Sequence, residues 1–313
     1  MKVAAVVVTY NRSELLKKAL TALEEQDYPV TQIIVIDNAS TDDTEEVLRT
    51  RKNKARIRVH RLRNNTGGAG GFYYGMDVAF DLDVDAFWLM DDDTVPRPEA
   101  LGELVRRMEE VAEYRGGKMP SYASSLVKWT DGTFCNMNLP TLKWNGVKPL
   151  AHGKTWLDLD CASFVSCLVT REAVVECGLP KPEYFIWFDD AEYTYRLAKW
   201  RPGIFVPESV VDHLMPSNEP ITWDMVTKDN MWKFGRGAHN QAAASISLKK
   251  PRILTDLTAG MYAFLKGSDV PYSLRAQLAW QVAKGVVSNI PVRFPTSMNR
   301  KPVRRLKHDR NDM

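Results

Sequence analysis

Residues 3–8 read Val-Ala-Ala-Val-Val-Val and decide the fold, because an unbroken run of β-branched and small apolar residues predicts a strand that is buried on both faces. Strands of this kind belong to parallel sheets that helices cover on both sides. A helix is expected from about Ser13, a good N-cap, since the leucines and alanines behind it fall at helical spacing. Ile33–Ile36 then repeats the buried strand pattern. The chain therefore opens as β-α-β.

The same alternation continues to the acidic residues near position 90. A helix is expected from about Thr41 through Leu48, and a third strand at Ile57–Arg61. A glycine-rich loop then leads into a helix and a fourth strand. This β-α-β-α-β-α-β order predicts a doubly wound α/β domain, in which ligands bind at the carboxyl ends of the strands.

The second half of the 313-residue chain is less regular. We expect a strand at Phe164–Thr170, a helix at about Asp189–Lys199 and a strand at Gly203–Val206. From about Pro251 the pattern is helical again. The sequence thus predicts one α/β domain with a helical C-terminal extension.

Three carboxylates close the fourth strand, where residues 86–93 read Ala-Phe-Trp-Leu-Met-Asp-Asp-Asp. In an extended chain residues i and i+2 point to the same side, so Asp91 and Asp93 can face one hard cation while Asp92 turns away. Such a pair suits Mg²⁺ or Mn²⁺ that carries a diphosphate. A solvated acidic turn is the alternative that the triplet alone leaves open.

The glycine-rich loop, Asn64–Gly71, predicts a contact with a nucleotide. Glycines where a loop enters a helix let backbone N–H groups approach phosphate oxygens or a flat base closely. The loop is not a Walker loop, since no Gly-Lys-Ser/Thr follows, and it does not satisfy GxGxxG. A flexible turn is the alternative.

A second acidic pair, Asp189-Asp190, follows the aromatic run Tyr184–Phe188. A helix macrodipole favours carboxylates in the first turn, so one of the two acids can be a simple cap. A carboxylate beside apolar rings also suits a general base, because the site can exclude water while the base faces an incoming hydroxyl. His213 follows the last predicted strand and is either a structural histidine or a third Mn²⁺ ligand.

The composition is that of a water-soluble globular protein. It is 44% hydrophobic and 26% charged, and its net charge of +3 gives no sign of a nucleic-acid partner. The four cysteines form no CxxC pair, so free thiols in a reducing compartment are expected. No apolar stretch approaches the roughly 18 to 20 residues that span a bilayer. These features predict a cytoplasmic protein.

The C-terminal segment combines apolar and aromatic residues, among them Tyr262 and Trp280, with the basic run Arg300–Lys307. It can lie as a peripheral contact on the inner face of the cell membrane and meet a lipid-linked acceptor. The alternative is a helical cap on the α/β domain, followed by a disordered tail.

Six motifs, taken in order, resemble one known family. They are Val-Thr-Tyr-Asn-Arg (8–12), Val-Ile-Asp-Asn-Ala-Ser (35–40), Asn-Thr-Gly-Gly-Ala-Gly-Gly (65–71), Met-Asp-Asp-Asp (90–93), Phe-Asp-Asp-Ala-Glu-Tyr (188–193) and Asp-His (212–213). Together they resemble the family 2 inverting glycosyltransferases of the GT-A fold. Within that family they are similar to the bacterial galactofuranosyltransferases and their rhamnosyltransferase relatives. The resemblance covers about residues 1–240.

The resemblance implies a Rossmann-like GT-A catalytic domain at residues 1–240, of the nucleotide-diphospho-sugar transferase type, and a helical extension at residues 241–313. It implies Mn²⁺ or Mg²⁺ as cofactor, bound by the residues Asp91, Asp93 and His213, and Asp190 as the catalytic base. The residues that it implies for nucleotide-sugar binding are Thr9, Tyr10, Asp37, Arg63, Asn65, Gly68, Asp92, Trp187 and Asp189. Trp232-Lys233 and His239-Asn240 stand roughly where the galactofuranosyl branch has an aromatic and Arg-Asn segment.

The implied reaction moves a sugar, with galactofuranose from UDP-galactofuranose as the first expectation, onto a cell-envelope glycan or a lipid-linked acceptor. A dTDP-rhamnose-dependent rhamnosyltransferase and a non-catalytic nucleotide-sugar-binding partner subunit are alternatives. A pure binder needs no base, which argues against the partner subunit. A nucleotidyltransferase normally has basic residues in its glycine-rich loop, and Gly67–Gly71 contains none.

Overall fold

The computed structural model describes residues 1–51, 56–267 and 271–288. One mixed sheet organises the chain, with the strand order β3-β2-β1-β4-β9-β6-β10-β8-β7 and with β5 paired to β10. The strands are β1 (Val3–Thr9), β2 (Gln32–Asp37), β3 (Ile57–Arg61), β4 (Ala86–Asp91), β5 (Thr94–Pro96), β6 (Tyr122–Trp129), β7 (Thr141–Leu142), β8 (Leu157–Cys161), β9 (Cys167–Thr170) and β10 (Gly203–His213). The α-helices are α1 (Ser13–Glu24), α2 (Thr44–Arg51), α3 (Gly67–Phe80), α4 (Ala100–Tyr114), α5 (Lys148–Ala151), α6 (Arg171–Cys177), α7 (Asp189–Trp200), α8 (Met231–Ser247), α9 (Pro251–Gly267) and α10 (Tyr272–Ser288). Three short 3-10 helices are η1 (Asn136–Asn138), η2 (Pro182–Tyr184) and η3 (Trp223–Met225).

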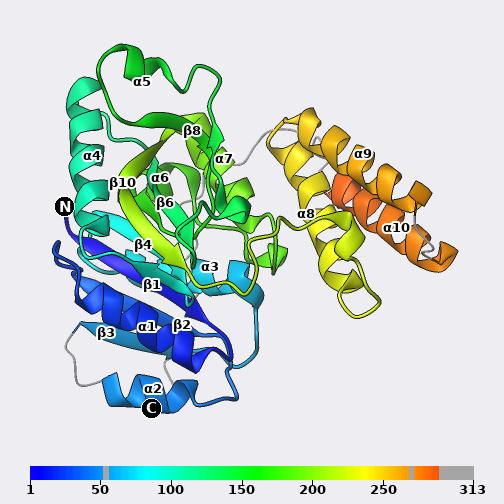
Figure 1. The fold of residues 1–313 in the computed structure, drawn as a ribbon, viewed down its shortest axis with the longest axis horizontal. Coiled ribbons are helices and arrows are strands. Elements are labelled where there is room, and N and C mark those ends of the chain that lie inside the picture. The colour runs from blue at the N-terminus through cyan, green and yellow to red at the C-terminus, as the bar shows by residue number, and fades with distance from the viewer. Residues whose placement is uncertain (52–55, 268–270, 289–313) are drawn as a thin grey trace, which may run out of the picture.

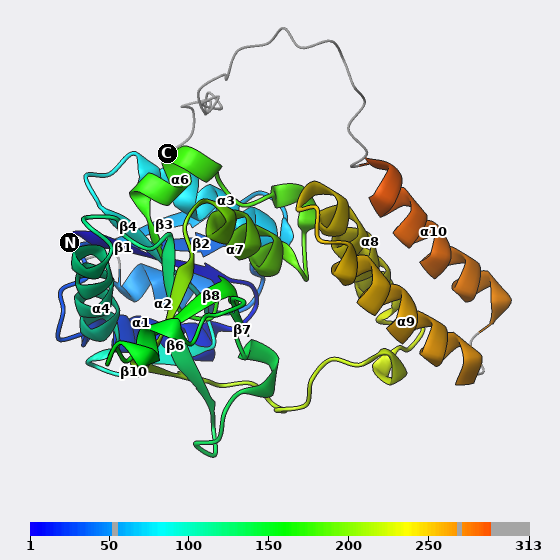
Figure 2. The ribbon, with the colours of Figure 1, turned by 90° about the horizontal axis from the view of Figure 1, so that it is seen from above.

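The first four strands confirm the predicted parallel half of the sheet. β1 pairs in parallel with β2 and β4, and β2 pairs in parallel with β3. Alternate residues of β1 face opposite sides, so Val7 packs with α1 and α4 while Val6 packs with α3 and α7. The helices therefore cover both faces of the sheet (Figures 1 and 2). This explains why β1 is apolar at every position from Val3 to Val8.

Strand β9 reverses the direction of the sheet. It lies antiparallel between β4 and β6, with Leu168 opposite Trp88 on one side and Ala123 on the other. The strand predicted from Phe164 begins at Cys167. The strand predicted to end at Val206 continues to His213. Its register against β6 shifts between Val206 and Val210, and its pairing with β6 then continues to His213.

Two predicted helix starts differ in detail from the structure. Ser13 is the first residue of α1 and not its N-cap. The carboxylate of Asp42, in the loop that follows β2, accepts the Ser13 N–H at 3.0 Å, so a side chain from another loop satisfies this helix end. The glycines from Gly67 to Gly71 lie inside the first turns of α3 and not in the preceding loop.

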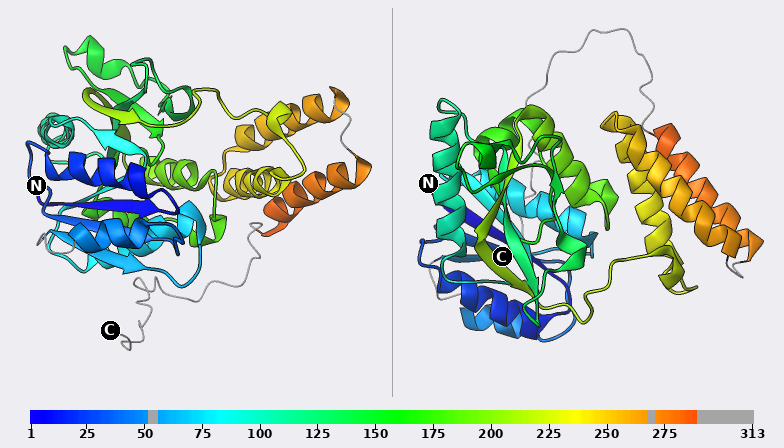
Figure 3. Two further views of the ribbon diagram at one scale, coloured as in Figure 1. Left: turned by 60° about the horizontal axis from the view of Figure 1, so that its bottom comes forward. Right: turned by 45° about the horizontal axis from the view of Figure 1, so that its top comes forward.

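Helices α8, α9 and α10 form a unit beside the sheet, with α8 nearest to it (Figure 3). The unit has a small core of its own, formed by Ala238, Ala242, Leu257 and Val282. α10 approaches α8 so closely that a Cβ at Gly285 would lie 2.3 Å from the His239 carbonyl oxygen. The predicted helical extension is therefore present. The boundary expected between residues 240 and 241 falls inside α8, which runs from Met231 to Ser247.

Within the described ranges, the structure contains no helix that is both long and apolar enough to cross a membrane. The four cysteines, Cys135, Cys161, Cys167 and Cys177, are free thiols as predicted. The basic run Arg300–Lys307 lies outside the described residues.

Candidate active site

A cleft of about 750 Å³ opens at the carboxyl ends of β1 and β4, where a doubly wound sheet is expected to bind its ligand. Its floor is the acidic triplet, and its far wall comes from residues 185–190 and from α8. The predicted site residues that line it are Thr9, Tyr10, Asn65, Gly68, Asp91, Asp92, Asp93, Trp187, Asp189, Asp190 and His213. Asp37 and Arg63 do not line it, because Asp37 is buried under the loop after β2 and Arg63 is exposed on the surface.

Asp92 is held by the end of β1. Its Oδ2 accepts hydrogen bonds from the Thr9 hydroxyl at 2.7 Å and from the Tyr10 backbone N–H at 3.3 Å. Burial raises the pKa of Asp92 to about 6, although the nearby positive charge of Arg12 acts in the opposite direction. Asp92 therefore fixes the turn after β4 against the strand beside it.

Arg12 contacts the same acids, although the sequence analysis gave it no role. Its Nη1 lies 2.5 Å from Oδ2 of Asp93 and 3.3 Å from Oδ1 of Asp92. The Arg12 side chain is 48% exposed, whereas both carboxylates are buried. The available signal was its position just after the first strand, where ligand-binding residues gather.

His213 is the second partner of Asp93. Its Nε2 lies 3.1 Å from Oδ1 of Asp93, and its Nδ1 lies 2.9 Å from Oδ1 of Asn138. Burial opposes a charge on the ring, but the hydrogen bonds to Asp93 and Cys135 and the charges of Asp93 and Asp91 together outweigh burial and raise the pKa of His213 to about 9. β10 carries His213 to this point by pairing with β5, which follows the acidic triplet directly.

Asp91 is affected by the negative charges of Asp93 and Asp92. Burial, and then the charge of Asp93, raises the pKa of Asp91 to about 7. Two carboxylates whose charges repel each other favour binding of a proton or a cation.

A divalent cation fits the donor chemistry of Asp91, Asp93 and His213, since carboxylates and imidazole are accepted Mn²⁺ ligands. Across residues 1–51, 56–267 and 271–288, no three His, Cys, Asp or Glu side chains already converge as a metal cluster. Arg12 supplies the positive charge beside Asp93 in this arrangement.

The second acidic pair lies at the start of α7. Asp189 is its first residue and is 8% exposed. Burial raises the pKa of Asp190 to about 6, even though its Oδ1 accepts the Ala191 backbone N–H at 2.6 Å. Burial, and then the charge of Asp190, raises the pKa of Asp189 well above its usual range, and the charge of Asp91 contributes to that rise. The two acidic groups therefore share one electrostatic environment.

The glycine run is more structural than its composition suggests. A Cβ at Gly67, where φ is +72°, would lie 1.9 Å from the Phe185 carbonyl oxygen. The Ala69 N–H donates to that same oxygen at 3.2 Å, so it is not free for a phosphate. Gly71 packs against Val8 of β1, and only Gly68 faces both the cleft and open space. The prediction that this run offers its N–H groups to a ligand therefore narrows to Gly68.

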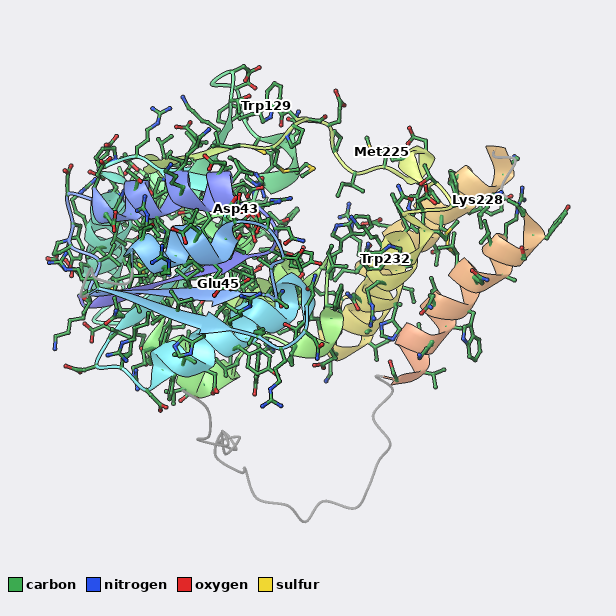
Figure 4. The ribbon with its side chains drawn as sticks, turned by 90° about the horizontal axis from the view of Figure 1, so that it is seen from below. Asp43, Glu45, Trp129, Met225, Lys228 and Trp232 are labelled. Atoms are coloured by element: carbon green, nitrogen blue, oxygen red, sulfur yellow. The ribbon has the colours of Figure 1, made fainter. Side chains whose placement is uncertain are left out.

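Aromatic residues line the cleft beside the second acidic pair. Trp187 packs edge-to-face on Phe234 of α8 with ring centroids 4.9 Å apart, and Phe185 packs on Trp232 at 6.0 Å. Trp232 is 52% exposed and lies on α8 (Figure 4). Lys233 lines the cleft next to it. The predicted aromatic wall is therefore completed by the helical unit.

Comparison with known proteins points to one family. The family model described as "Glycosyl transferase family 2" matches residues 4–164. The galactofuranosyltransferase GlfT1 of Mycolicibacterium smegmatis is 40% identical over 94 residues, which are 30% of each chain. The poly(ribitol-phosphate) beta-N-acetylglucosaminyltransferase TarS of Staphylococcus aureus is 36% identical over 72 residues, which are 22% of this chain and 13% of that protein. The matched segments thus span no more than 30% of these curated relatives.

Solved structures show the same fold. The crystal structure of S. aureus TarS aligns with a TM-score of 0.62 at 17% identity, covering 94% of this chain and 50% of that one. The mannosyltransferase PcManGT from Pyrobaculum calidifontis, in complex with GDP-Man and Mn²⁺, aligns with a TM-score of 0.53 at 17% identity, covering 92% and 87%. These likenesses confirm the predicted GT-A fold with its helical C-terminal segment.

Proposed function

Because the chain belongs to glycosyl transferase family 2, we propose that it is an inverting glycosyltransferase that moves a sugar from a nucleotide-diphosphate donor to an acceptor hydroxyl. One observation carries the proposal. The acidic triplet after β4 and the acidic pair at the start of α7 line one cleft, and the charge of Asp91 acts on Asp189. A binding protein has use for the first group, but only a transfer reaction needs a base as well.

Asp190 is the proposed base. Its carboxylate takes the proton from the acceptor hydroxyl while that oxygen forms a bond to the anomeric carbon, and the bond from this carbon to the diphosphate breaks. The electron pair leaves with the nucleoside diphosphate. A carboxylate whose pKa is about 6 is ionised at neutral pH and still accepts a proton more readily than an ordinary one.

Asp91, Asp93 and His213 are the proposed ligands of a Mn²⁺ or Mg²⁺ ion. Such an ion, when bound, offsets the negative charge of the departing diphosphate. The Mn²⁺ in the complex of PcManGT supports this cofactor class. Arg12 keeps the acidic floor partly neutralised by its contacts with Asp92 and Asp93.

The proposed nucleotide end of the cleft is formed by five of its lining residues, which are Thr9, Tyr10, Asn65, Gly68 and Asp92. Asp37 and Arg63 are proposed to border the nucleotide end without lining it. Each lies close in sequence to a lining residue, Asp37 to Asn38 and Arg63 to Asn65. At the other end, Trp187 and Asp189 are proposed to contact the sugar beside Asp190.

The preferred donor in this proposal is UDP-galactofuranose, which the similarity to galactofuranosyltransferase GlfT1 supports. The proposed acceptor is a cell-envelope glycan or a lipid-linked glycan. A dTDP-rhamnose donor and a non-catalytic partner subunit are the competing outcomes. A thermal-shift panel of UDP, dTDP, GDP and ATP, each with and without Mn²⁺, separates them because a bound ligand raises stability by mass action. Stabilisation by UDP that depends on Mn²⁺ supports the preferred donor class, and dTDP preference supports rhamnosyl transfer. No response to any nucleotide contradicts the proposal.

The helical unit is proposed to contact the inner face of the cell membrane, with the enzyme in the cytoplasm. Tyr272, Trp280 and Val287 are 86%, 66% and 67% exposed, and their spacing places them on one face of α10. The residues that follow, 289–313, contain seven Lys or Arg against two Asp, which complements an anionic lipid surface. An aromatic face next to basic residues is typical of interfacial helices.

A further inference from the structure

The segment Tyr184–Phe188, which leads into the acidic pair, has an unusual backbone. Phe185, Trp187 and Phe188 have φ of 62°, 64° and 69°. Residues with a Cβ rarely adopt positive φ, and bulky residues do so only where their surroundings enforce it. Three aromatic residues in this region within four positions therefore require a strong local restraint.

Asn240 of α8 provides a restraint on one side. Its side chain is fully buried, and its Nδ2 donates to the carbonyl oxygens of Tyr184 at 2.9 Å, Ile186 at 3.1 Å and Trp187 at 2.8 Å. One turn earlier, a Cβ at Gly237 would lie only 2.9 Å from the Trp187 ring. Helix α8 thus packs against the Trp187 ring and, one turn later, donates hydrogen bonds to the carbonyl groups of the segment.

Helix α3 provides the restraint on the other side. The Ala69 N–H donates to the Phe185 carbonyl oxygen at 3.2 Å, and the absence of a Cβ at Gly67 lets this oxygen approach. The segment is therefore fixed between the helix that borders the nucleotide end and the first helix of the C-terminal unit. Asp189 and Asp190 directly follow this segment in the chain, so the segment sets where they lie.

We propose that Asn240 is a positioning residue for transfer: by binding three carbonyl groups of the strained segment, it aims Asp190 into the cleft without touching substrate itself. This inference rests on the proposed function. It makes the helical unit a part of the catalytic apparatus, since Asn240 belongs to α8. Asn240 is not a cleft-lining residue, so its loss alters the direction of the base and leaves the nucleotide end unchanged.

The test compares Asn240→Ala and Asn240→Asp with a matched control, Ser245→Ala. Ser245 is also buried on α8, but its hydroxyl donates to the Lys250 carbonyl oxygen and not to the segment. A misplaced catalytic group can cost roughly 100-fold in rate. We expect both Asn240 variants to lose roughly 10- to 100-fold in kcat, with UDP affinity in the presence of Mn²⁺ within about 2-fold of the unsubstituted protein. The control should keep its kcat even if its Tm falls equally.

Hydrogen exchange gives a readout that does not depend on activity. In Asn240→Ala, amides of residues 185–191 should exchange about 10-fold faster, while those of β1 and β4 stay unchanged. Unchanged exchange in that segment, or a kcat equal to that of the control, would overturn the inference. If the unsubstituted protein binds nucleotide but transfers no sugar, yet exchange rises locally, the restraint stands and the proposed function fails. Should both Asn240 variants not fold, Asn240→Gln, which keeps the amide group on a side chain longer by one methylene, takes their place, and a kcat equal to that of the control rejects the inference.

Discussion

Arg12 and Asp93 are 81 residues apart in sequence, yet Nη1 of Arg12 lies 2.5 Å from Oδ2 of Asp93, and His213 occupies the other oxygen of the same carboxylate. If a divalent cation binds Asp93 as proposed, it needs the carboxylate oxygen that Arg12 contacts. Arg12 and the cation would then compete for Asp93, and this competition can be measured.

The first prediction concerns Arg12→Gln. Without metal, loss of a half-exposed charged contact should lower stability by about 1 kcal/mol, which is a few degrees in Tm. With UDP and Mn²⁺, the rise in Tm should be larger than in the unsubstituted protein, because the competitor is gone. Differential scanning fluorimetry measures both effects. Arg49→Gln, at an exposed pair with Glu46, is the control. A smaller Mn²⁺ response in Arg12→Gln than in the control would contradict the competition.

The second prediction concerns Asp93→Ala. If Asp93 is a metal ligand, UDP binding should no longer depend on Mn²⁺, and affinity should fall by roughly 10-fold or more in titration calorimetry. Asp43→Ala, at an exposed residue before α2, should behave like the unsubstituted protein. Retained Mn²⁺ dependence in Asp93→Ala would remove this residue from the ligand set.

The third prediction is that Asp190→Asn separates activity from stability. Turnover should fall by roughly 100-fold or more with little change in UDP affinity. Folding raises the pKa of Asp190 from 3.8 to about 6, so its contribution to stability is present below about pH 4 and is lost as pH rises through 6. At pH 7 the ionised carboxylate opposes folding, and the Asn variant should have the higher Tm. Asp43→Asn, at an exposed residue before α2, is the control. A lower Tm of Asp190→Asn at pH 7 would refute this argument.

The fourth prediction is the pH dependence of transfer. Because the base must be ionised, kcat/KM should rise about tenfold per pH unit below pH 6 and level off above about pH 7. Steady-state rates from pH 5 to pH 8 at saturating Mn²⁺ would show this limb. A rate that increases toward lower pH would exclude Asp190 as the base.

The fifth prediction concerns the membrane contact of the helical unit. The full chain should sediment with phosphatidylglycerol vesicles and not with phosphatidylcholine vesicles, since each Lys or Arg near an anionic surface contributes about 1 kcal/mol. Removing residues 300–313 should lower the bound fraction at least tenfold, and Trp280→Ser should lower it further. Val175→Ser, which removes an exposed apolar residue on α6, should have no effect. Equal sedimentation with and without the tail would reject a tail-driven anchor.

The sequence predicted best what depends on local pattern. β1, β2 and β4 lie where continuous apolar runs placed them, β3 lies where it was predicted, and the acidic residues follow β4 as expected. α7 begins at Asp189, as the acidic first turn indicated. These features follow from burial of both faces of a strand and from the helix dipole, which act over a few residues.

The sequence predicted poorly what depends on contacts between distant segments. The N-terminal end of α1 is satisfied by Asp42 from another loop, so Ser13 looked like a cap although it is not one. A glycine is required at position 67 by the close approach of the Phe185 carbonyl group, 118 positions along the chain, and not by a ligand. The sequence does not predict the roles of Arg12 and Asn240, because their partners are set by tertiary structure alone.

The cleft is assembled from two stretches of chain that meet only after folding. The family model ends at residue 164, so it includes Thr9 and Asp91–Asp93 but stops before Asp190, His213 and Asn240. If the proposed function is right, changes in residues 184–241 can alter the acceptor and leave the nucleotide end at β1 and β4 as it is, because Asn240 holds the strained segment to α8.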